Sequence, residues 1–202
     1  METLDIVIAT NNPNKVREYK ELFEGYDVNV TSLKEEGIVS SPEEGGTTFT
    51  DNALIKARDA RKYTSKIVIA DDSGICIHAL SNFPGVYSAR FMEGHSYEEK
   101  NLKINEMLQD KDDKSASYHC AIALVSDEEE KVFVGTCEGV IVSPVEGPYG
   151  FGYDPIFYFE PYNKTFSLTL PDDKNKVSHR GKATRLLMEY LKQKIEKNEK
   201  MK

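Results

Sequence analysis

The feature that most constrains the fold is an alternation of two hydrophobic patterns along the chain. Short apolar runs rich in β-branched residues, such as Leu4 to Ala9 and Val28 to Leu33, have the composition of strands. Between them, the segment from Val16 to Phe23 carries apolar residues at helical spacing. Strands interleaved with helices predict an α/β protein with a mixed sheet.

Further elements continue this alternation. Thr48 and Asp51 have the spacing of a capping box, with Asp in place of the usual Glu or Gln, so a helix is expected to begin near Thr48. Two short strands, Ile67 to Ala70 and Ile75 to Leu80, are expected on either side of a break at Asp71 to Gly74. Helices are also predicted over 97–108 and 181–195, and a β-hairpin over 118–125 and 132–142.

The length of 202 residues fits one domain, or one domain with two lobes. We expect a single domain over residues 1–195, followed by a Lys- and Glu-rich tail, 196–202, that frays. The hairpin and the stretch around Tyr97 are candidates for the second lobe. Because clefts between lobes are common ligand sites, the two lobes are expected to flank a substrate cleft.

Charge and composition narrow the function. Hydrophobic residues make up 39% and charged residues 30%, which predicts a packed core rather than disorder. The net charge of −8 argues against binding to nucleic acid polymers, although local cations and backbone N–H groups can still hold an anionic small molecule. Three widely spaced cysteines indicate neither a zinc site nor a disulfide framework. No apolar run approaches the roughly 18 residues of a membrane span, so a cytoplasmic protein without membrane contact is expected.

The first candidate binding segment connects the first predicted strand to the first predicted helix. It consists of Thr10, Asn11, Asn12, Pro13, Asn14 and Lys15. Such a turn directs backbone N–H groups outward, and the helix N-terminus adds partial positive charge, which together suit a polyphosphate. The alternative is an ordinary strand-to-helix turn in which Asn12 or Asn14 only caps the helix.

The second candidate is acidic. Asp71 and Asp72 follow an apolar strand, and adjacent carboxylates stay ionised more easily beside a cation such as Mg²⁺. One carboxylate can also orient a water molecule for attack on phosphorus. In the loop from Glu43 to Gly46, Glu44 is a candidate to share the metal with Asp72. The alternatives are an Asp-rich turn with Gly74 at positive φ and a solvated acidic loop.

A glycine- and aromatic-rich run, Gly147 to Pro155, suits a nucleobase. Two aromatic residues of this run stand between glycines, which let a ring lie flat against a base. Asp154 can accept hydrogen bonds from the base or the sugar. The alternative is a glycine-aromatic bend at a strand end.

Basic side chains form the last group of candidates. His179 and Arg180, just before the last predicted helix, offer donors to carbonyl oxygens of a base, and Lys174 suits a phosphate. Lys56, on the predicted second helix, can also reach a phosphate. The alternative for these residues is a solvated surface charge.

Taken together, these segments resemble the inosine/xanthosine triphosphate pyrophosphatase family, the Ham1-like enzymes. The segments that carry the resemblance occur in family order over most of the chain. They are Ala9 to Lys15, Glu44 to Phe49, Asp51 to Ala53, Ala70 to Gly74, Pro84 to Arg90, Phe151 to Pro155 and Ser178 to Arg180. The chain departs from the family pattern where it has Gly45 in place of Thr and Asp51 in place of Glu.

The resemblance implies hydrolysis of non-standard purine nucleoside triphosphates (ITP, dITP and XTP) to the monophosphate and pyrophosphate. It also implies Mg²⁺ as cofactor, a homodimer, and an elongated α/β fold with a long mixed sheet. By match, Thr10 to Lys15 hold the triphosphate, and Glu44 and Asp72 hold Mg²⁺, with Asp72 also the proton acceptor. The implied nucleotide contacts are Ser73, Phe151, Gly152, Tyr153, Asp154, Lys174, His179 and Arg180.

A mechanism and a basis for selectivity follow as hypotheses. Asp72 aligns a water molecule at the α-phosphorus, while lysines and turn amides stabilise charge on the departing pyrophosphate. Donors from His179, Arg180 or backbone amides satisfy the 6-oxygen of hypoxanthine or xanthine and oppose the amino group of adenine. Asp71 is expected to support Asp72. The sequence does not indicate how the 2-amino group of guanine is excluded.

Two other functions use the same residues. A Maf-like pyrophosphatase would share the handling of phosphates but prefer pyrimidine or modified nucleotides. A nucleotide-binding module without turnover is the alternative outside enzymes. The adjacent carboxylates argue against it, because binding alone rarely calls for both.

Overall fold

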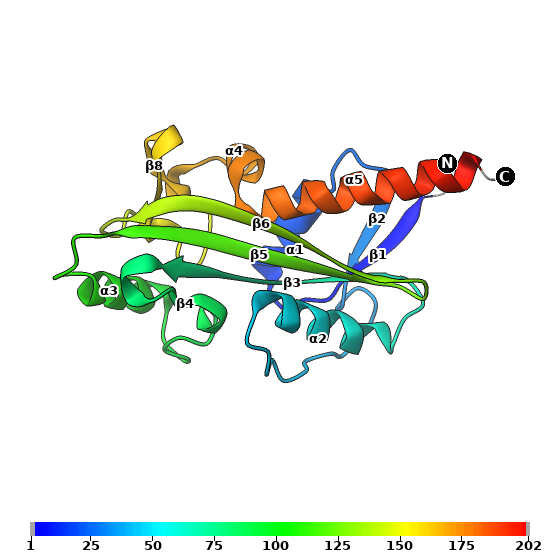
Figure 1. Cartoon of the computed structure of the whole chain (residues 1–202), viewed down its shortest axis with the longest axis horizontal. Coiled ribbons are helices and arrows are strands. Elements are labelled where there is room, and N and C mark those ends of the chain that lie inside the picture. Colours follow the sequence, from blue (N-terminus) through cyan, green and yellow to red (C-terminus); the bar gives the residue numbers. More distant parts are fainter. Residues whose placement is uncertain (1–2, 201–202) are drawn as a thin grey trace. The chain divides into compact units, whose positions relative to one another are not determined.

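The computed structural model describes residues 3–200 and shows one α/β domain built on a mixed eight-stranded sheet, with five α-helices in this part of the chain (Figure 1). The strand order is β2-β1-β3-β5-β6-β7-β8, and β4 pairs with β3.

The strands are β1 (Leu4–Ile8), β2 (Val28–Ser32), β3 (Ile67–Ile77), β4 (Phe83–Pro84), β5 (Ser115–Val125), β6 (Glu130–Ile141), β7 (Phe157–Phe159) and β8 (Lys164–Thr165). The helices are α1 (Pro13–Leu22), α2 (Phe49–Arg61), α3 (Tyr97–Met107), α4 (Pro171–Val177) and α5 (His179–Lys200). β1 is parallel to β2 and β3, whereas β7 is antiparallel to β6 and β8, so the predicted α/β class with a mixed sheet is confirmed.

The domain contains two compact units, which are described separately. Unit 1 comprises the described residues up to Asp72, together with Cys120–Gly135 and the residues from Arg180 onward. Unit 2 comprises Ser73–His119 and Thr136–His179. Each unit therefore contains part of β3, β5 and β6.

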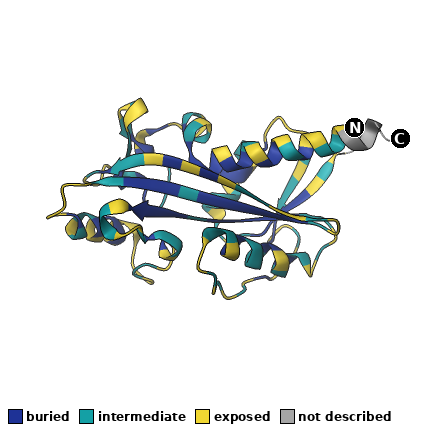
Figure 2. Ribbon diagram, in the orientation of Figure 1, coloured by how far each residue is buried: buried dark blue, intermediate teal, exposed yellow. Residues whose placement is uncertain are grey.

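In unit 1, helices cover both faces of the sheet, as the period-two alternation of a buried strand requires. Ile8 of β1 belongs to a buried cluster that contains Tyr19 of α1 and Leu187 of α5. Its neighbour Val7 points the other way, into a cluster with Ala57 of α2. Figure 1 shows α2 and α5 on opposite sides of β1 and β3, and Figure 2 shows exposed residues on the outer surfaces of both helices. Successive residues of β3 in this unit therefore meet different helices.

Unit 2 has a separate core with more aromatic side chains. Ile75 and Ile77 of β3 pack in one buried cluster with Ile104 of α3 and with Phe157 and Phe166. The ring of Phe157 lies 5.0 Å from that of Phe166, centroid to centroid, at an interplanar angle of 43°. Large rings contribute much buried apolar area, so this cluster gives the loops of unit 2 a rigid support.

The largest difference from the sequence-based expectation concerns β3. It runs without interruption over Ile67–Ile77, so Asp71 and Asp72 lie inside a strand, and the predicted break between two short strands is wrong. Gly74 is not among the described residues with positive φ, so the alternative of a glycine turn is also excluded. Adjacent polar residues usually indicate a loop. Here the carboxylates remain in the sheet because Lys15 and Arg180 pair with Asp71, and Lys56 pairs with Asp72.

The C-terminal region also differs from the prediction. α4, which was not predicted, ends at Val177, and only its C-cap residue Ser178 separates it from α5, which begins with His179. His179 and Arg180 thus form the first turn of the last helix instead of preceding it. Residues 196–200, which were expected to fray, continue α5, whereas residues 201 and 202 of the predicted tail lie outside the described residues.

Other elements match the prediction closely. α2 begins after Thr48, whose hydroxyl accepts a hydrogen bond from the backbone N–H of Asp51 at 3.1 Å. The predicted hairpin is present as β5 and β6, and β2 ends at Ser32. Within residues 3–200, no helix is long and apolar enough to cross a membrane.

Candidate active site

The two adjacent carboxylates lie on β3 just beyond the end of β1. β1 pairs with β3 as far as Ile8 opposite Ile69, and the backbone N–H of Ala9 donates to Ile69 O at 2.7 Å. From there the β1 chain turns toward α1, while β3 continues through Asp71 and Asp72. The carboxyl ends of parallel strands commonly border ligand sites. Because consecutive strand residues point to opposite faces, the two carboxylates have different neighbours.

Asp72 faces α2, and both of its carboxylate oxygens have partners there. The Asn52 side-chain amide donates to Asp72 Oδ2 at 3.2 Å, and Lys56 Nζ lies 3.4 Å from Asp72 Oδ1. The same ammonium lies 3.3 Å from Glu44 Oε2, in the loop before α2. Asn52 and Lys56 are four residues apart and so share one face of the helix. The structure thus brings together Glu44 and Asp72, as the sequence predicted.

Burial and neighbouring charges act in opposite directions on the pKa values of this group. Burial raises the pKa of Asp72, although Lys56 and Lys15 oppose the shift. For Lys56, burial lowers the pKa, but the nearby carboxylates of Asp72, Asp71 and Glu44 outweigh it, so the pKa lies above its usual value. Asp72 is therefore a more basic carboxylate than an exposed Asp, and Lys56 remains charged at neutral pH.

Asp71 faces α1 and α5, where it belongs to a buried network of alternating charges. Lys15 Nζ lies 3.0 Å from Asp71 Oδ1, and Arg180 Nη2 lies 3.2 Å from Asp71 Oδ2. Arg180 also pairs with Glu18 of α1. Burial lowers the pKa of Arg180, but Glu18 and Asp71 outweigh it and raise the pKa well above its ordinary value. Asp71 thus anchors Lys15 at the start of α1, and it lies on the face of β3 opposite to Asp72.

The strand-to-helix turn from Thr10 to Lys15 is held by its own side chains. Asn12 is the N-cap of α1, and its side-chain oxygen accepts from the backbone N–H groups of Asn14 and Lys15 at 2.9 and 3.4 Å. Asn11 donates to Ser40 O at 3.0 Å, and Thr10 Oγ1 accepts from Asn12 N at 3.1 Å. Of the two residues considered as helix caps in the alternative interpretation, Asn12 is the N-cap and Asn14 lies inside the helix. Pro13 occupies the first helical turn, where its missing N–H costs nothing.

In unit 2, Asp154 closes the loop that begins at Gly150. Its carboxylate is 2% exposed and accepts hydrogen bonds from Lys174 Nζ at 2.7 Å, Tyr118 Oη at 3.1 Å and Phe151 N at 2.9 Å. Gly150 has a φ of +74°, and a Cβ there would lie 2.3 Å from Asp154 Oδ2. The glycine is therefore required both by backbone conformation and by close approach to the carboxylate.

The aromatic residues of this loop differ in exposure. Phe151 is half-buried, with Lys174 Nζ 5.1 Å from its ring centroid. Tyr153 is buried, and its hydroxyl donates to Ser88 O at 2.6 Å. Of the two rings predicted to contact the nucleotide, Phe151 and Tyr153, Phe151 is thus the more accessible. Gly152 O accepts from the buried side-chain amide of Asn101 at 3.1 Å.

The two remaining predicted residues of unit 2 have contrasting surroundings. His179 is buried, and its ring stacks on Tyr118 with centroids 4.5 Å apart and an interplanar angle of 9°. Ser73 is half-buried and follows Asp72 directly on β3. Tyr118 therefore contacts both Asp154 and His179, and it connects β5 to the nucleotide-binding candidates of this unit.

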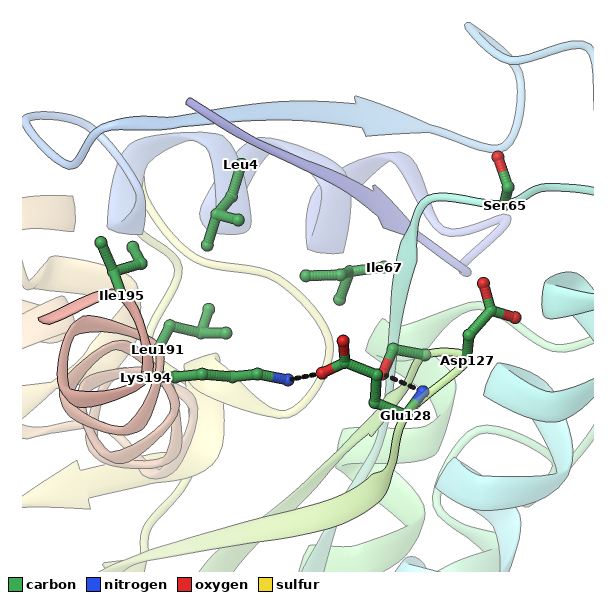
Figure 3. Close-up of a pocket in the computed structure, with 9 residues that line it drawn as sticks. Leu4, Ser65, Ile67, Asp127, Glu128, Leu191, Lys194 and Ile195 are labelled. Carbon is green, nitrogen blue, oxygen red and sulfur yellow. Dashed lines mark hydrogen bonds and ion pairs between the residues drawn. The ribbon is translucent and has the colours of Figure 1, made fainter. Parts of the chain in front are cut away.

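A cavity of about 270 Å³ in unit 1 lies elsewhere, at the start of β1 and the β5–β6 turn (Figure 3). It is lined by Leu4, Ser65, Ile67, Ser126, Asp127, Glu128, Leu191, Lys194 and Ile195. Figure 3 shows the Lys194 ammonium turned toward Glu128, with which it forms a 2.7 Å ion pair. No predicted site residue lines this cavity, so it is separate from the carboxylate centre.

The residues around Lys56 fit a divalent cation bound together with a substrate. Glu44 and Asp72 already converge on one positive charge, the Lys56 ammonium. Within residues 3–200, no group of three or more His, Cys, Asp and Glu side chains could hold a metal ion. A pair of carboxylates with the remaining ligands from water and phosphate is the arrangement that suits Mg²⁺.

Tyr118→Phe tests the support of the Asp154 loop. Removing the hydroxyl takes away a hydrogen bond to a buried carboxylate, so we expect a loss of about 1.5–3 kcal/mol in the free energy of unfolding. Urea denaturation measures this loss. Tyr87→Phe, at a ring that is 57% exposed in the same unit, is the matched control and should leave stability unchanged. Equal stability of both variants would contradict the assigned role of the Tyr118 hydroxyl.

Several residues that organise these groups were not predicted from the sequence. Asn52, Glu18 and Tyr118 are buried polar residues that contact Asp72, Arg180 and Asp154, respectively. The only sequence signal is a polar residue among apolar helix or strand positions. Asn52 was part of a matching motif, but no role was assigned to it.

The comparisons with known proteins agree with the motifs. A sequence model of the Ham1 family matches residues 6–190. The dITP/XTP pyrophosphatase of Caldanaerobacter subterraneus subsp. tengcongensis is 44% identical over 199 residues, which covers 96% of this chain and 100% of the relative. The dITP/XTP pyrophosphatase of Leptospira interrogans serogroup Icterohaemorrhagiae serovar copenhageni is 44% identical over 192 residues, which covers 94% of this chain and 98% of the relative.

Solved structures give the same result. The Staphylococcus aureus Ham1 protein has a TM-score of 0.84 and 39% identity, covering 94% of this chain and 99% of that chain. The HAM1 protein from Coxiella burnetii has a TM-score of 0.85 and 39% identity over the same shares. Sequence motifs, near full-length relatives and fold all agree, and the chain belongs to the Ham1 family.

Proposed function

We propose that this protein hydrolyses the non-standard purine nucleoside triphosphates ITP, dITP and XTP to the nucleoside monophosphate and pyrophosphate. The observation that carries the proposal is the convergence of Glu44 and Asp72 on a single cationic group. In the same unit, the start of α1 carries Lys15, which suits an anionic phosphate. The relatives named dITP/XTP pyrophosphatase support this substrate class.

Mg²⁺ is the proposed cofactor, and Glu44 and Asp72 would hold it. When bound, it would neutralise phosphate charge and polarise the phosphoryl group. The Lys56 ammonium lies against both carboxylates, 3.3 Å from Glu44 Oε2 and 3.4 Å from Asp72 Oδ1. Both proposed metal ligands, Glu44 and Asp72, thus lie close enough to contact the same cationic group, which supports the proposal that they share a metal ion.

Asp72 is the proposed proton acceptor for the attacking water. The water oxygen bonds to the α-phosphorus, the bond from that phosphorus to the bridging oxygen of the departing pyrophosphate breaks, and the proton passes to Asp72. Burial raises the pKa of Asp72, which makes the carboxylate a stronger base. Lys15 and Lys56 supply positive charge for the departing pyrophosphate.

The residues of unit 2 are proposed to contact the base and sugar. Phe151 is the ring proposed to stack on a purine, while Asp154 and Lys174 hold its loop in place. The predicted nucleotide contacts of Ser73, Gly152, Tyr153 and His179 in this unit, and of Arg180 in unit 1, are retained in this proposal. By family resemblance we also propose a homodimer that acts in the cytoplasm.

Product analysis with ITP and Mg²⁺ tests the reaction. We expect IMP and pyrophosphate in equal amounts, because attack occurs at the α-phosphorus. Release of orthophosphate would refute the reaction class, and tight nucleotide binding without a metal-dependent product would support a non-catalytic module. A panel that includes pyrimidine nucleotides distinguishes the proposal from a Maf-like preference.

Selectivity is expected to favour ITP and XTP strongly over ATP. A site built to donate hydrogen bonds to a 6-oxygen rejects an amino group there by on the order of 10⁴-fold, because buried donors would face each other. The ratio of kcat/KM for ITP and ATP measures this discrimination. Comparable values for the two substrates would contradict the proposed base recognition.

A further inference from the structure

We infer that Asn52 is a positioning residue that ties the Glu44 loop to Asp72 and so fixes the separation of the two carboxylates. The inference rests on the proposed function, in which Glu44 and Asp72 share a cation. Asn52 lies on the first turns of α2 and is fully buried, at 0% exposed. A buried amide is costly unless its polar atoms are paired, so its contacts carry information about its role.

The Asn52 side chain contacts both partners at once, in a single orientation. Its carbonyl oxygen accepts from the backbone N–H of Gly46 at 2.9 Å, and its amino group donates to Asp72 Oδ2 at 3.2 Å. Reversing the amide would place its amino group against an N–H donor and its oxygen against a carboxylate. The two hydrogen bonds therefore fix the amide, and the amide in turn fixes the loop relative to β3.

The neighbouring glycines show how closely the loop approaches Asn52. A Cβ on Gly46 would lie 2.5 Å from Asn52 Oδ1 and 2.6 Å from Asp51 Cβ. Gly45 has no heavy atom within 4 Å of the corresponding position, and its φ lies outside the left-handed region. The close approach of the loop to the start of α2 thus requires glycine at 46 but not at 45, where the family pattern has Thr.

The contacts of Asn52 and Lys56 use different oxygens of Asp72. Lys56 lies against Oδ1, whereas Asn52 donates to Oδ2. The Asn52 hydrogen bond therefore does not depend on the position of the Lys56 ammonium. Residues that orient ligating carboxylates in this way typically change metal affinity or activity by about 10–100-fold when they are replaced.

Asn52→Leu is the direct test, because Leu has a similar volume and lacks both hydrogen bonds. We expect Mn²⁺ affinity, measured by titration of the protein alone, to fall by about 10–100-fold. The Mg²⁺ concentration for half-maximal ITP hydrolysis should rise in parallel and kcat should fall. KM for ITP at saturating Mg²⁺ should stay close to the wild-type value, because Asn52 contacts none of the proposed nucleotide residues.

Asn101→Leu is the matched control for loss of a buried amide. Asn101 is 2% exposed and donates to Gly152 O in unit 2. This variant is expected to raise KM for ITP while Mn²⁺ affinity stays at the wild-type level. Asn52→Leu should thus change Mn²⁺ affinity but not KM, and Asn101→Leu should change KM but not Mn²⁺ affinity. This difference distinguishes positioning of the carboxylates from general destabilisation.

Adjacent glycines provide a second, independent test. Gly46→Ala should reproduce the loss of Mn²⁺ affinity, and Gly45→Ala should not. The double variant Gly46→Ala with Asn52→Leu should lose less Mn²⁺ affinity than the sum of the two single losses, because both changes break the contact between Gly46 and Asn52. If Asn52→Leu fails to fold, Asn52→Ser and the glycine pair give the same comparison.

Wild-type Mn²⁺ affinity in Asn52→Leu, or equal losses in Asn52→Leu and Asn101→Leu, would overturn the inference. The Mn²⁺ titration requires no turnover. If the wild-type protein releases no pyrophosphate from ITP, the proposed function fails, while the titration still decides whether Asn52 positions the carboxylates.

Discussion

Replacing Asp72 with Asn is expected to lower kcat for pyrophosphate release from ITP by on the order of 10³-fold or more, without unfolding the protein. Asn has nearly the same size, but it cannot accept the proton of the attacking water and is a poor ligand for Mg²⁺. Lys56 would then lie against Glu44 without its second carboxylate. Loss of one residue thus removes the proton acceptor and a metal ligand together.

The stability of Asp72→Asn should be unchanged or slightly increased. Burial raises the pKa of Asp72, so the folded state binds its proton more tightly than the unfolded state does. The ionised carboxylate therefore costs stability at pH values above its folded pKa, and a neutral Asn avoids that cost. The side-chain oxygen of the new Asn can still accept from Asn52, while the lost attraction to Lys56 offsets part of the gain. Active-site residues commonly lower the stability of the fold while they contribute to activity.

Single-turnover kinetics with ITP and a thermal melt of the same sample measure both effects. Asp59→Asn is the control, because Asp59 is also on α2 but pairs with Ser40 and Lys62. Its kcat should stay near the wild-type value. A near-normal rate in Asp72→Asn, or an equal loss in Asp59→Asn, would contradict the role given to Asp72.

The fold could be predicted where local signals agree with the tertiary structure. β1, β2, α1 and α2 have apolar residues at the expected spacing, and Thr48 caps α2 as its spacing with Asp51 indicated. β3 could not be predicted as a continuous strand, because polar residues at its centre are the usual sign of a turn. Their partners Lys15, Lys56 and Arg180 come from distant parts of the chain.

In the candidate site, the residues proposed for the chemistry could be predicted from the sequence, whereas the residues that support them could not. Glu44 and Asp72 were predicted together, and the structure brings both to one Lys56 ammonium. The supporting residues were missed because their partners are remote in sequence. Glu18 and Arg180, for example, are 162 positions apart and pair only because α1 and α5 cover the same face of the sheet. Because consecutive side chains of a strand point to opposite faces, the adjacent carboxylates are also separated. Asp72 points toward α2, and Asp71 points toward Arg180.

Arg180→Met is expected to cause the largest loss of stability, about 3–5 kcal/mol. Arg180 is 2% exposed and lies between Glu18 and Asp71, which are also buried. Removing the guanidinium leaves two buried carboxylates, of which Asp71 keeps Lys15 as a partner. For a domain of this size, the loss corresponds to a melting temperature lower by roughly 6–20 °C.

The exposed pair of Arg58 and Glu130 provides the matched control in the same unit. Its side chains are 53% and 42% exposed, so Arg58→Met should cost only about 0–1 kcal/mol, although its ion pair is as short as many buried ones. Combining Arg180→Met with Glu18→Leu should cost less than the sum of the single changes, because the two residues form one buried ion pair and each single change breaks it. Equal losses for Arg180→Met and Arg58→Met would show that the buried network contributes no more than a surface pair. In that case the only remaining role of Asp71 would be to hold Lys15 at the start of α1. The proposed difference in function between the two adjacent carboxylates would then depend on the contacts of Asp72 alone.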